Sequence, residues 1–387
     1  MKLQAISSKA LSAALGVSAK CMQKRNAMSI LDYVLLSMRD GRFMFTTSTS
    51  ESQLTIPAPL TLTSGTFTAP VALPIGSILS FLGALPDCVV NMTLEDNHSL
   101  TLDYCMTVRE QVKSGRVVLS YMDGTDFPQI PALAQEGQTS IVLPAADFFA
   151  AVNDAQAFSC REEVKRILNS LCIDISEDRS SCYFVATDTR QLVKKTFMGS
   201  VFFRAGTPCR IIVHNRFFRA LSAFAGEGDI SIDTDGNNIR FQSDDTEFVC
   251  KALEGKYPNY NAIIPVGSPY YAVFDAKEMA GAIRRVSIFS DSATQAVMLR
   301  RDGDCLLVEA ADTINASVAA EQVLLEDVQC EEGFSICLGA PMLLNAMNTL
   351  DGEVRMLFSS ADKQALFVAN EPVAPVQIII MPIRRIA

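Results

Sequence analysis

Two histidines and eleven cysteines are the side chains of this sequence that could most readily bind a metal ion or act as nucleophiles. The histidines fall in structural contexts, since His98 lies in a turn-like stretch and His214 lies where a helix is expected to begin. The number of cysteines is odd, and no two of them form a Cys-x-x-Cys pair. We therefore expect no metal site, no cofactor and no disulfide framework from cysteines 21, 88, 105, 160, 172, 182, 209, 250, 305, 330 and 337.

The sequence motifs of nucleotide, metalloprotease and acyl-transfer chemistry are also absent. The sequence contains no GxxxxGK[ST] phosphate loop, no GxGxxG, no HExxH and no GxSxG. The acidic pairs Asp244–Asp245 and Glu331–Glu332 fall in turn-like segments, which is typical of solvated loops. We expect no catalytic residues and predict that the protein is not an enzyme. The alternative that stays open is an enzyme built from repeats, with an active site of an unrecognised kind.

Length and composition indicate a folded protein of two or three domains. Of 387 residues, 49% are hydrophobic, and 33 basic against 43 acidic residues give a net charge of -10. This balance excludes a generally basic protein that coats nucleic acid, although it allows a local basic surface. Scattered thiols favour the reducing cytoplasm, and Lys20 before Cys21 argues against a cleaved leader. The longest C-terminal apolar run, 378–383, is too short to cross a membrane.

Internal repetition is the main organising feature of the chain. Each helical segment of one set is followed by a turn and two strands of alternating polarity. After His214–Phe224, for example, the two strands are Asp229–Asp233 and Asn238–Gln242. This pattern predicts a helix–strand–strand unit that is used six times. The similar helical segments are Leu11–Ser18, Phe148–Ser159 and Met279–Ser290 in one set, and Pro74–Leu85, His214–Phe224 and Ala340–Leu350 in the other.

A repeated turn places the domain boundaries. Asp123–Pro131 resembles Glu254–Pro265, and Pro128 and Pro258 lie 130 residues apart. Both stretches adjoin segments rich in Pro, Gly and polar residues, which are typical of linkers. We predict three domains at 1–133, 138–254 and 255–387. Each would hold two helices and many short strands, which gives an α+β fold.

The six expected helical segments differ in charge from the rest of the chain. They hold nine basic and four acidic residues, a net charge of +5, so the remainder carries -15. If these helices share one face of an assembly, that face attracts phosphates without reading bases. Each Lys or Arg alone could equally belong to an ordinary polar helix face, so the pattern across the repeats carries the prediction. The segments are 7–25, 74–85, 144–158, 214–224, 275–288 and 340–350.

Short motifs in a fixed order resemble those of a known family. The most specific is Ile378–Arg384 (IIIMPIR), which resembles a terminal apolar strand followed by Met-Pro-aliphatic-Arg. The others are Phe184–Asp188, Gly255–Tyr260 with Ile263–Pro265, Phe127–Pro128 and Ser29–Leu31. Together with the threefold repeat, they resemble the bacterial DNA polymerase III sliding clamp, the β subunit that acts as a processivity factor. By this resemblance the chain is identified as a divergent member of that family.

The sequence departs from the family in one turn and at its end. The family's Thr-Asp-Gly-His-Arg-Leu reads Thr187-Asp-Thr-Arg-Gln-Leu192 here, so Thr189 replaces the glycine. If this position has a positive φ, threonine restricts it and the turn differs locally. The chain also continues past the family's usual end as Arg385-Ile-Ala387.

The resemblance implies the α+β DNA-clamp fold, with three similar domains that each pack two helices on antiparallel sheets. Two chains joined head to tail would then form a homodimeric ring that encircles double-stranded DNA without reading its sequence. Family matching places Arg25 at a loop that faces DNA. Helix position and charge add Lys20, Lys24, Arg216, Arg219, Lys277, Arg284 and Arg285 as DNA-binding residues.

The resemblance also implies a hydrophobic cleft that binds short peptides from partner proteins. These partners are the replicative DNA polymerase subunit and other proteins with a clamp-binding motif, and an ATP-dependent clamp loader would place the ring on DNA. Leu168 and Ile263 could equally be core residues, whereas Met342 and Met381 suit a surface that accepts several peptides. The cleft maps onto Leu168, Thr187, Leu192, Pro258, Ile263, Met342, Ile379, Ile380, Met381, Pro382 and Ile383.

The implied dimer contact pairs the strand Arg116–Tyr121 of one chain with a strand near Ala316–Val323 of the other. The alternative interpretation is an internal strand and an ordinary helix end. The apolar residues that would meet across this contact are Val117, Leu119, Ile288 and Phe289.

Overall fold

A computed structural model describes residues 1–5, 7–23, 28–108, 111–131, 133, 139–176, 178, 180–198, 202–204, 210–224, 226, 228–312 and 314–383. The chain divides into two compact units. The N-terminal unit comprises Met1–Phe149, Phe202–Pro208 and Arg216–Ala252, and the C-terminal unit comprises Ala150–Val201, Cys209–Asn215 and Leu253–Ala387. The division into three domains stays a prediction.

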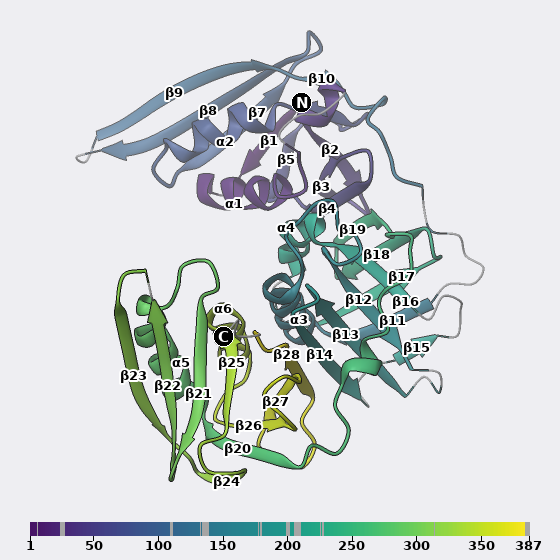
Figure 1. The fold of residues 1–387 in the computed structure, drawn as a ribbon. Helices are drawn as coiled ribbons and strands as arrows, with labels where there is room; N and C mark the ends of the chain where they lie inside the picture. Colours follow the sequence, from purple (N-terminus) through teal and green to yellow (C-terminus); the bar gives the residue numbers. More distant parts are fainter. Residues whose placement is uncertain are drawn as a thin grey trace. The chain divides into compact units, whose positions relative to one another are not determined.

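The N-terminal unit is built on antiparallel sheets (Figure 1). One sheet has the order β5 (Leu60–Ser64), β1 (Lys2–Ala5), β7 (Val89–Leu94), β8 (Ser99–Val108) and β9 (Gln111–Ser120). A longer sheet has the order β10 (Met122–Asp123), β6 (Val71–Leu73), β2 (Val34–Arg39), β3 (Arg42–Ser48), β4 (Ser52–Pro57), β19 (Thr246–Lys251), β18 (Asn238–Ser243), β17 (Asp229–Thr234), β11 (Thr139–Pro144) and β15 (Phe202–Arg204). The pairing of β4 with β19 therefore joins segments that are far apart in the sequence.

The C-terminal unit has the same antiparallel design. Its longer sheet has the order β16 (Arg210–His214), β12 (Ser170–Ile175), β13 (Ser181–Thr187), β14 (Gln191–Met198), β28 (Val376–Ile380), β27 (Ala365–Ala369), β26 (Glu353–Phe358), β20 (Tyr270–Asp275) and β24 (Asp327–Gln329). Its shorter sheet has the order β23 (Ser317–Leu324), β22 (Cys305–Asp312), β21 (Ala296–Asp302) and β25 (Ser335–Gly339). The pairing of β14 with β28 is the long-range joint of this unit.

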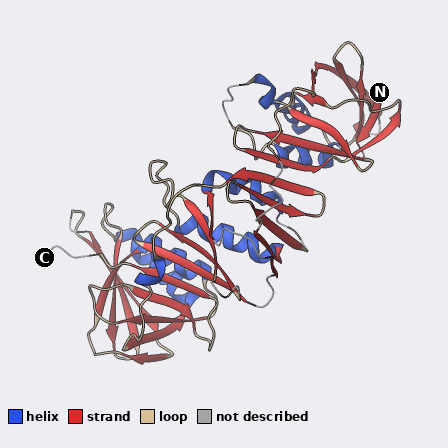
Figure 2. Ribbon diagram, turned by 90° about the vertical axis from the view of Figure 1, so that its right-hand side faces the viewer, coloured by secondary structure: helices blue, strands red, loops and turns tan. Residues whose placement is uncertain are grey.

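Helices lie against the strands of each unit, as the blue and red ribbons of Figure 2 show. In α1 (Ser8–Ser18) the Ser7 hydroxyl caps the first turn by accepting a hydrogen bond from the Ala10 N–H. Leu11 and Leu15 are buried one turn apart, which is the spacing of a core-facing stripe. Asp275 caps α5 (Ala276–Val286) by accepting from the Glu278 N–H at 2.8 Å. The remaining long helices are α2 (Ile75–Gly83), α3 (Ala145–Phe158) and α6 (Ala340–Thr349).

The structure confirms a helical segment at five of the six expected places and modifies the sixth. Where one helix was expected over 214–224, the chain forms η2 (Asn215–Phe217), α4 (Phe218–Leu221) and η3 (Ser222–Phe224). Phe217, at the end of η2, and Phe218, at the start of α4, are both buried in this interrupted segment. The Ser222 hydroxyl also donates to the Arg219 carbonyl at 2.7 Å, which competes with regular helical bonding.

The described helices include none with the length and apolar character needed to span a bilayer.

Gly115 makes room for an aromatic side chain on the neighbouring strand. It lies opposite Tyr104 in the β8–β9 pair, and a Cβ atom at position 115 would overlap the end of the Tyr104 ring. That ring makes an edge contact with Phe81 of α2 at a centroid distance of 5.4 Å. Glycine at position 115 therefore lets the sheet and α2 share one aromatic contact.

We expect Gly115→Ala to lower the free energy of unfolding by about 1–2 kcal/mol, because Tyr104 must leave its place against Phe81. Denaturant unfolding followed by circular dichroism measures the change. Gly16→Ala in α1 is the matched control, since no atom lies within 4 Å of its Cβ position, and it should raise stability by up to about 1 kcal/mol. Equal effects of the two substitutions would contradict this account of Gly115.

Candidate functional site

The cations of α5 are exposed and engaged by neighbouring side chains. Lys277 Nζ lies 3.0 Å from Asp351 Oδ1, and Arg284 Nη2 donates to Asn348 Oδ1 of α6 at 2.8 Å. Arg285 makes a two-pronged ion pair with Glu321 of β23, with Nε at 2.9 Å from Oε2. Its guanidinium, through this hydrogen bond, holds the pKa of Glu321 below the ordinary value.

Two predicted DNA-binding residues of the N-terminal unit, Lys20 and Arg216, also contact neighbouring side chains. Lys20 Nζ donates to the Ser222 hydroxyl at 2.8 Å, and Arg216 forms an ion pair with Glu51. Arg219 is exposed on α4. Lys24 and Arg25 lie outside the described residues. Several cations on the helical segments thus have an acidic partner that the helical segments themselves do not contain.

These ion pairs do not prevent the cations from meeting phosphate. The Lys277 and Arg285 side chains are exposed, and exposed ion pairs contribute only about 0–1 kcal/mol each, while the exposed Arg284 meets the neutral Asn348. A phosphate can therefore replace the acidic partner at little cost, although each such partner lowers the positive potential of the surface. The sequence did not indicate these acidic partners, because they lie outside the helical segments and far along the chain from their cations. They are Glu51, Glu321 and Asp351.

The predicted peptide-cleft residues separate by burial into two groups. Thr187, Leu192, Ile379 and Ile380 are buried, so their side chains belong to the core. Leu192 and Ile379 pack in one cluster with Tyr257 and Tyr260. The residues with exposed or half-buried side chains, which a peptide can reach, are Leu168, Pro258, Ile263, Met342, Met381, Pro382 and Ile383.

The tyrosines of the 255–260 motif anchor this segment to strands β12 and β13. Tyr257 donates from its hydroxyl to the Val185 carbonyl at 3.3 Å, and Tyr260 donates to Asp174 Oδ2 at 2.7 Å. Burial raises the pKa of Tyr260, and the bond to Asp174 raises it further. Pro258 is exposed, and the buried tyrosines on either side of it fix its position.

The C-terminal segment is fixed by backbone hydrogen bonds on either side. The Met381 N–H donates to the Arg190 carbonyl at 2.7 Å, and the Ile383 N–H donates to the Cys337 carbonyl at 2.9 Å. Met381 is 37% exposed at the point where β28 ends. The turn between β13 and β14 therefore sets the position of the apolar chain end.

That turn has a structural twin in the N-terminal unit. The Thr187 hydroxyl donates to the Gln191 carbonyl at 2.7 Å, and Asp188 Oδ1 accepts from the backbone N–H groups of Arg190 and Gln191. The same bonds recur at 234–238, where Thr234 donates to the Asn238 carbonyl at 2.7 Å. The central residue is Thr189, with a φ of 83°, in the first turn and Gly236, with a φ of 93°, in the second. The glycine replacement noted in the sequence thus falls at a left-handed position.

The residues of the predicted dimer contact lie on exposed elements. β9 and β23 are the outermost described strands of their sheets. Val117 and Leu119 are half-buried on β9. Ile288 is 75% exposed and Phe289 45% exposed in the short helix η5 (Ser287–Phe289) that follows α5.

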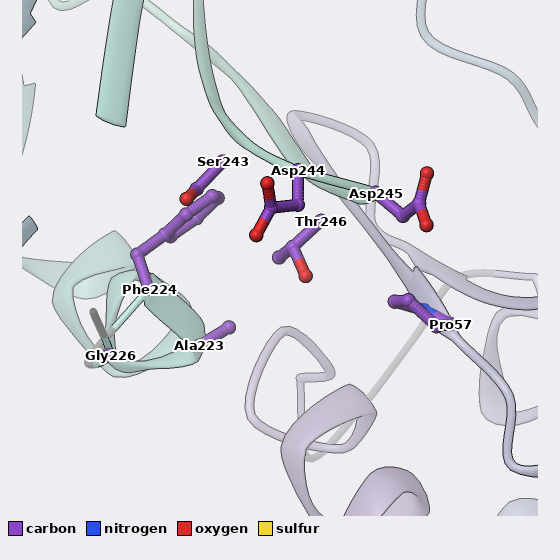
Figure 3. A pocket seen from close by; sticks show the side chains of 8 residues that line it. All are labelled: Pro57, Ala223, Phe224, Gly226, Ser243, Asp244, Asp245 and Thr246. Carbon is purple, nitrogen blue, oxygen red and sulfur yellow. The ribbon is translucent and has the colours of Figure 1, made fainter. Parts of the chain in front are cut away.

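The acidic pair Asp244–Asp245 lines a surface pocket beside η3 (Figure 3). Phe224 and Pro57 supply its apolar walls, and Asp245 forms an ion pair with Arg42. In the part of the chain that the structure describes, no group of three or more His, Cys, Asp or Glu residues is arranged to hold a metal ion. The interpretation of this pair as a solvated turn is consistent with its position.

Comparison with known proteins gives matches along nearly the whole chain. No protein-family model matches it. The beta sliding clamp of Vibrio cholerae is 26% identical over 369 residues, with 93% of each chain covered, and that of Synechocystis is 24% identical, with 97% of each covered. The crystal structure of a DnaN sliding clamp (DNA polymerase III subunit beta) from Pseudomonas aeruginosa bound to griselimycin superposes with a TM-score of 0.85 at 18% identity, and covers 100% of both chains. The beta subunit from the DNA polymerase of Streptococcus pyogenes also gives 0.85, at 16% identity and 100% coverage of both.

The chain is a divergent relative of the bacterial beta sliding clamps. It has the DNA-clamp fold, with helices packed on antiparallel sheets, as expected from the terminal motif and the repeats. The individual DNA, cleft and dimer residues stay predictions.

One constraint on the predicted peptide surface had a signal in the sequence, and others had none. The Thr-Asp-x-x-x pattern that the two twin turns share could have indicated a positive φ at Thr189. The side-chain contacts of Gln191 with α3 and α6 had no signal in the sequence, since they join residues up to 154 positions apart.

We expect Thr189→Gly to stabilise this clamp relative by about 1 kcal/mol, because a β-branched residue is strained at positive φ. The reverse change in the twin turn, Gly236→Thr, should destabilise it by a similar amount. Thermal unfolding of both variants and the unaltered protein measures the difference. A destabilising effect of Thr189→Gly would show that the threonine side chain contributes more than its strain costs.

Proposed function

We propose that this protein is a DNA sliding clamp. Two chains joined head to tail close a ring around duplex DNA and tether a replicative polymerase, so that processivity comes from topology and not from tight binding. The observation that carries the proposal is similarity over the entire length, in fold to solved clamps and in sequence to curated beta sliding clamps. A protein with this function binds and slides, and carries out no chemical step of its own.

The electrostatics support sliding rather than sequence recognition. Lys277, Arg284 and Arg285 are exposed on α5, and the ion pairs of Lys277 and Arg285 are of the weak, exposed kind. Contacts of this kind position a duplex through its phosphates and carry no base information. Individually weak contacts also exchange readily as the duplex moves.

Exposed strand edges support assembly into a ring. β9 and β23 each end a sheet, and an outermost strand offers N–H and C=O groups to a second chain. If β9 of one chain pairs with β23 of another, the contact is heterologous and two such contacts can close a dimer. The exposed apolar residues Ile288 and Phe289 would then meet Val117 and Leu119.

The partner proteins would dock by short peptides. Pro258, Ile263 and Met381 are exposed apolar residues of the predicted cleft, and an extended peptide with aliphatic or aromatic anchors suits such a surface. Proposed ligands are the replicative polymerase subunit and other proteins with a clamp-binding motif. A separate ATP-dependent loader would open the ring.

We expect the protein, once loaded, to stay on nicked circular DNA and to leave after the circle is linearised. Arg284→Glu should reduce the loaded fraction about three- to ten-fold on any sequence, and the difference should shrink at high salt, because a phosphate contact becomes a repulsion that salt screens. Lys363→Glu makes the same charge change in a turn and should leave loading unchanged. Gel filtration separates DNA-bound from free protein. Equal retention on circles and linear DNA would contradict the topological mechanism.

We expect the double change Ile288→Lys and Phe289→Lys to separate the dimer while each chain stays folded, because two charges would be buried against an apolar surface at a cost of several kcal/mol, roughly. Sedimentation velocity at nanomolar to micromolar concentration reports the state. Val373→Lys is the matched control, since Val373 is 74% exposed against 75% for Ile288. A double variant that stays dimeric at nanomolar concentration would remove this pair from the contact.

A further inference from the structure

The side chain of Gln191 leaves the 187–191 turn and enters a polar joint between other elements. Gln191 is only 6% exposed. Its Nε2 donates to the Ala157 carbonyl of α3 at 3.2 Å and to Asp188 Oδ2 at 3.1 Å. Asn238, at the matching position of the twin turn, has a shorter side chain.

Asn345 of α6 completes the joint from the opposite direction. Its Nδ2 donates to Gln191 Oε1 at 3.2 Å and to the Ala157 carbonyl at 3.2 Å. Ala157 is one residue before the end of α3, where carbonyl groups have no partner within the helix. One helix-end carbonyl thus receives amide donors from β14 and from α6.

The same three elements meet a second time further from the turn. Asp154 of α3 lies 3.6 Å from Lys195 Nζ of β14 and accepts from the Thr349 hydroxyl of α6 at 3.4 Å. Burial raises the pKa of Asp154, while the nearby Lys195 opposes that change. This second joint holds the helices and the strand together without touching the turn.

The 187–191 turn links the position of Gln191 to that of Met381. In the β14–β28 pair Gln191 lies opposite Ile380, and the neighbouring Arg190 carbonyl accepts the Met381 N–H at 2.7 Å. A shift of Gln191 therefore moves the hydrogen bond that sets Met381. Thr189, strained at a φ of 83°, would otherwise favour a different turn.

We propose that Gln191 and Asn345 form an amide bridge that positions the 187–191 turn, and through it Met381, for peptide binding. Both are positioning residues and neither needs to touch the peptide. The inference rests on the proposed function, because it assigns to the bridge a role in peptide docking. It adds that Asn345 of α6 and the carbonyl at the end of α3 affect the peptide affinity of a surface that they do not themselves line.

The test measures peptide affinity by fluorescence anisotropy with full-length protein and a polymerase-tail peptide that contains a Gln and aliphatic or aromatic anchors. Both variants lose the hydrogen bond between Gln191 and Asn345, and Gln191→Ala and Asn345→Ala should each weaken binding about three- to ten-fold, the order of magnitude of one buried hydrogen bond. Their combination should be little worse than either alone, because both remove the same bridge. Thr349→Val disrupts only the second joint and should bind within about two-fold of the unaltered protein.

Hydrogen exchange gives a readout that does not depend on the peptide. The Met381 amide should exchange faster in Gln191→Ala and Asn345→Ala than in Thr349→Val. Should Gln191→Ala fail to fold, Asn345→Ala decides, since it leaves the bonds within the turn intact.

The outcomes separate the inference from the function on which it rests. Unchanged affinity and exchange in the bridge variants, or equal losses in Thr349→Val, would overturn the positioning role alone. Failure of the unaltered protein to bind the peptide would overturn peptide docking and the inference with it, whatever the exchange rates show.

Discussion

The backbone pairing of β14 with β28 is the interaction on which the candidate peptide surface depends. It joins residues 191–195 to residues 376–380, which are nearly two hundred positions away. Leu192 and Ile379 pack against each other in the buried cluster beneath this pairing. The 187–191 turn, the Met381 segment and the two tyrosines that hold Pro258 all take their positions from this seam. The exposed apolar residues Pro258 and Met381 are therefore held by the adjoining hydrophobic core and do not belong to an independent loop.

On the predicted DNA-binding surface, the positive charges of the helices are partly neutralised by nearby carboxylates. The helix cations are accompanied by carboxylates from strands and turns, as with Arg285 and Glu321 or Arg216 and Glu51. Such exposed pairs neither stabilise the fold appreciably nor fix the cations against phosphate. A surface of this kind has a weaker field than the helix charges alone suggest, which suits transient contacts with a moving duplex.

Much of the fold could be predicted from local patterns. The buried stripe of α5, its Asp275 cap and the alternating strand Glu353–Phe358 all have signals within a few residues, because helix and strand periods are local. The segment 214–224 differs from the expected single helix, since the chain there forms the three short elements η2, α4 and η3. Acidic partners of the cations and the bridge between Gln191 and Asn345 depend on contacts made only after folding. No spacing in the chain encodes them.

The predicted middle domain contributes strands to the long sheets of both units. Its residues, 138–254, enter these sheets through β19 beside β4 and through β14 beside β28. The sequence repeat, which predicts three domains, therefore does not coincide with the two compact units of the structure. Without the middle segment, β4 and β28 would each lose a neighbouring strand, and a sheet edge would be exposed in both units. Such edges pair readily with other chains, so the middle segment protects both long sheets from aggregation.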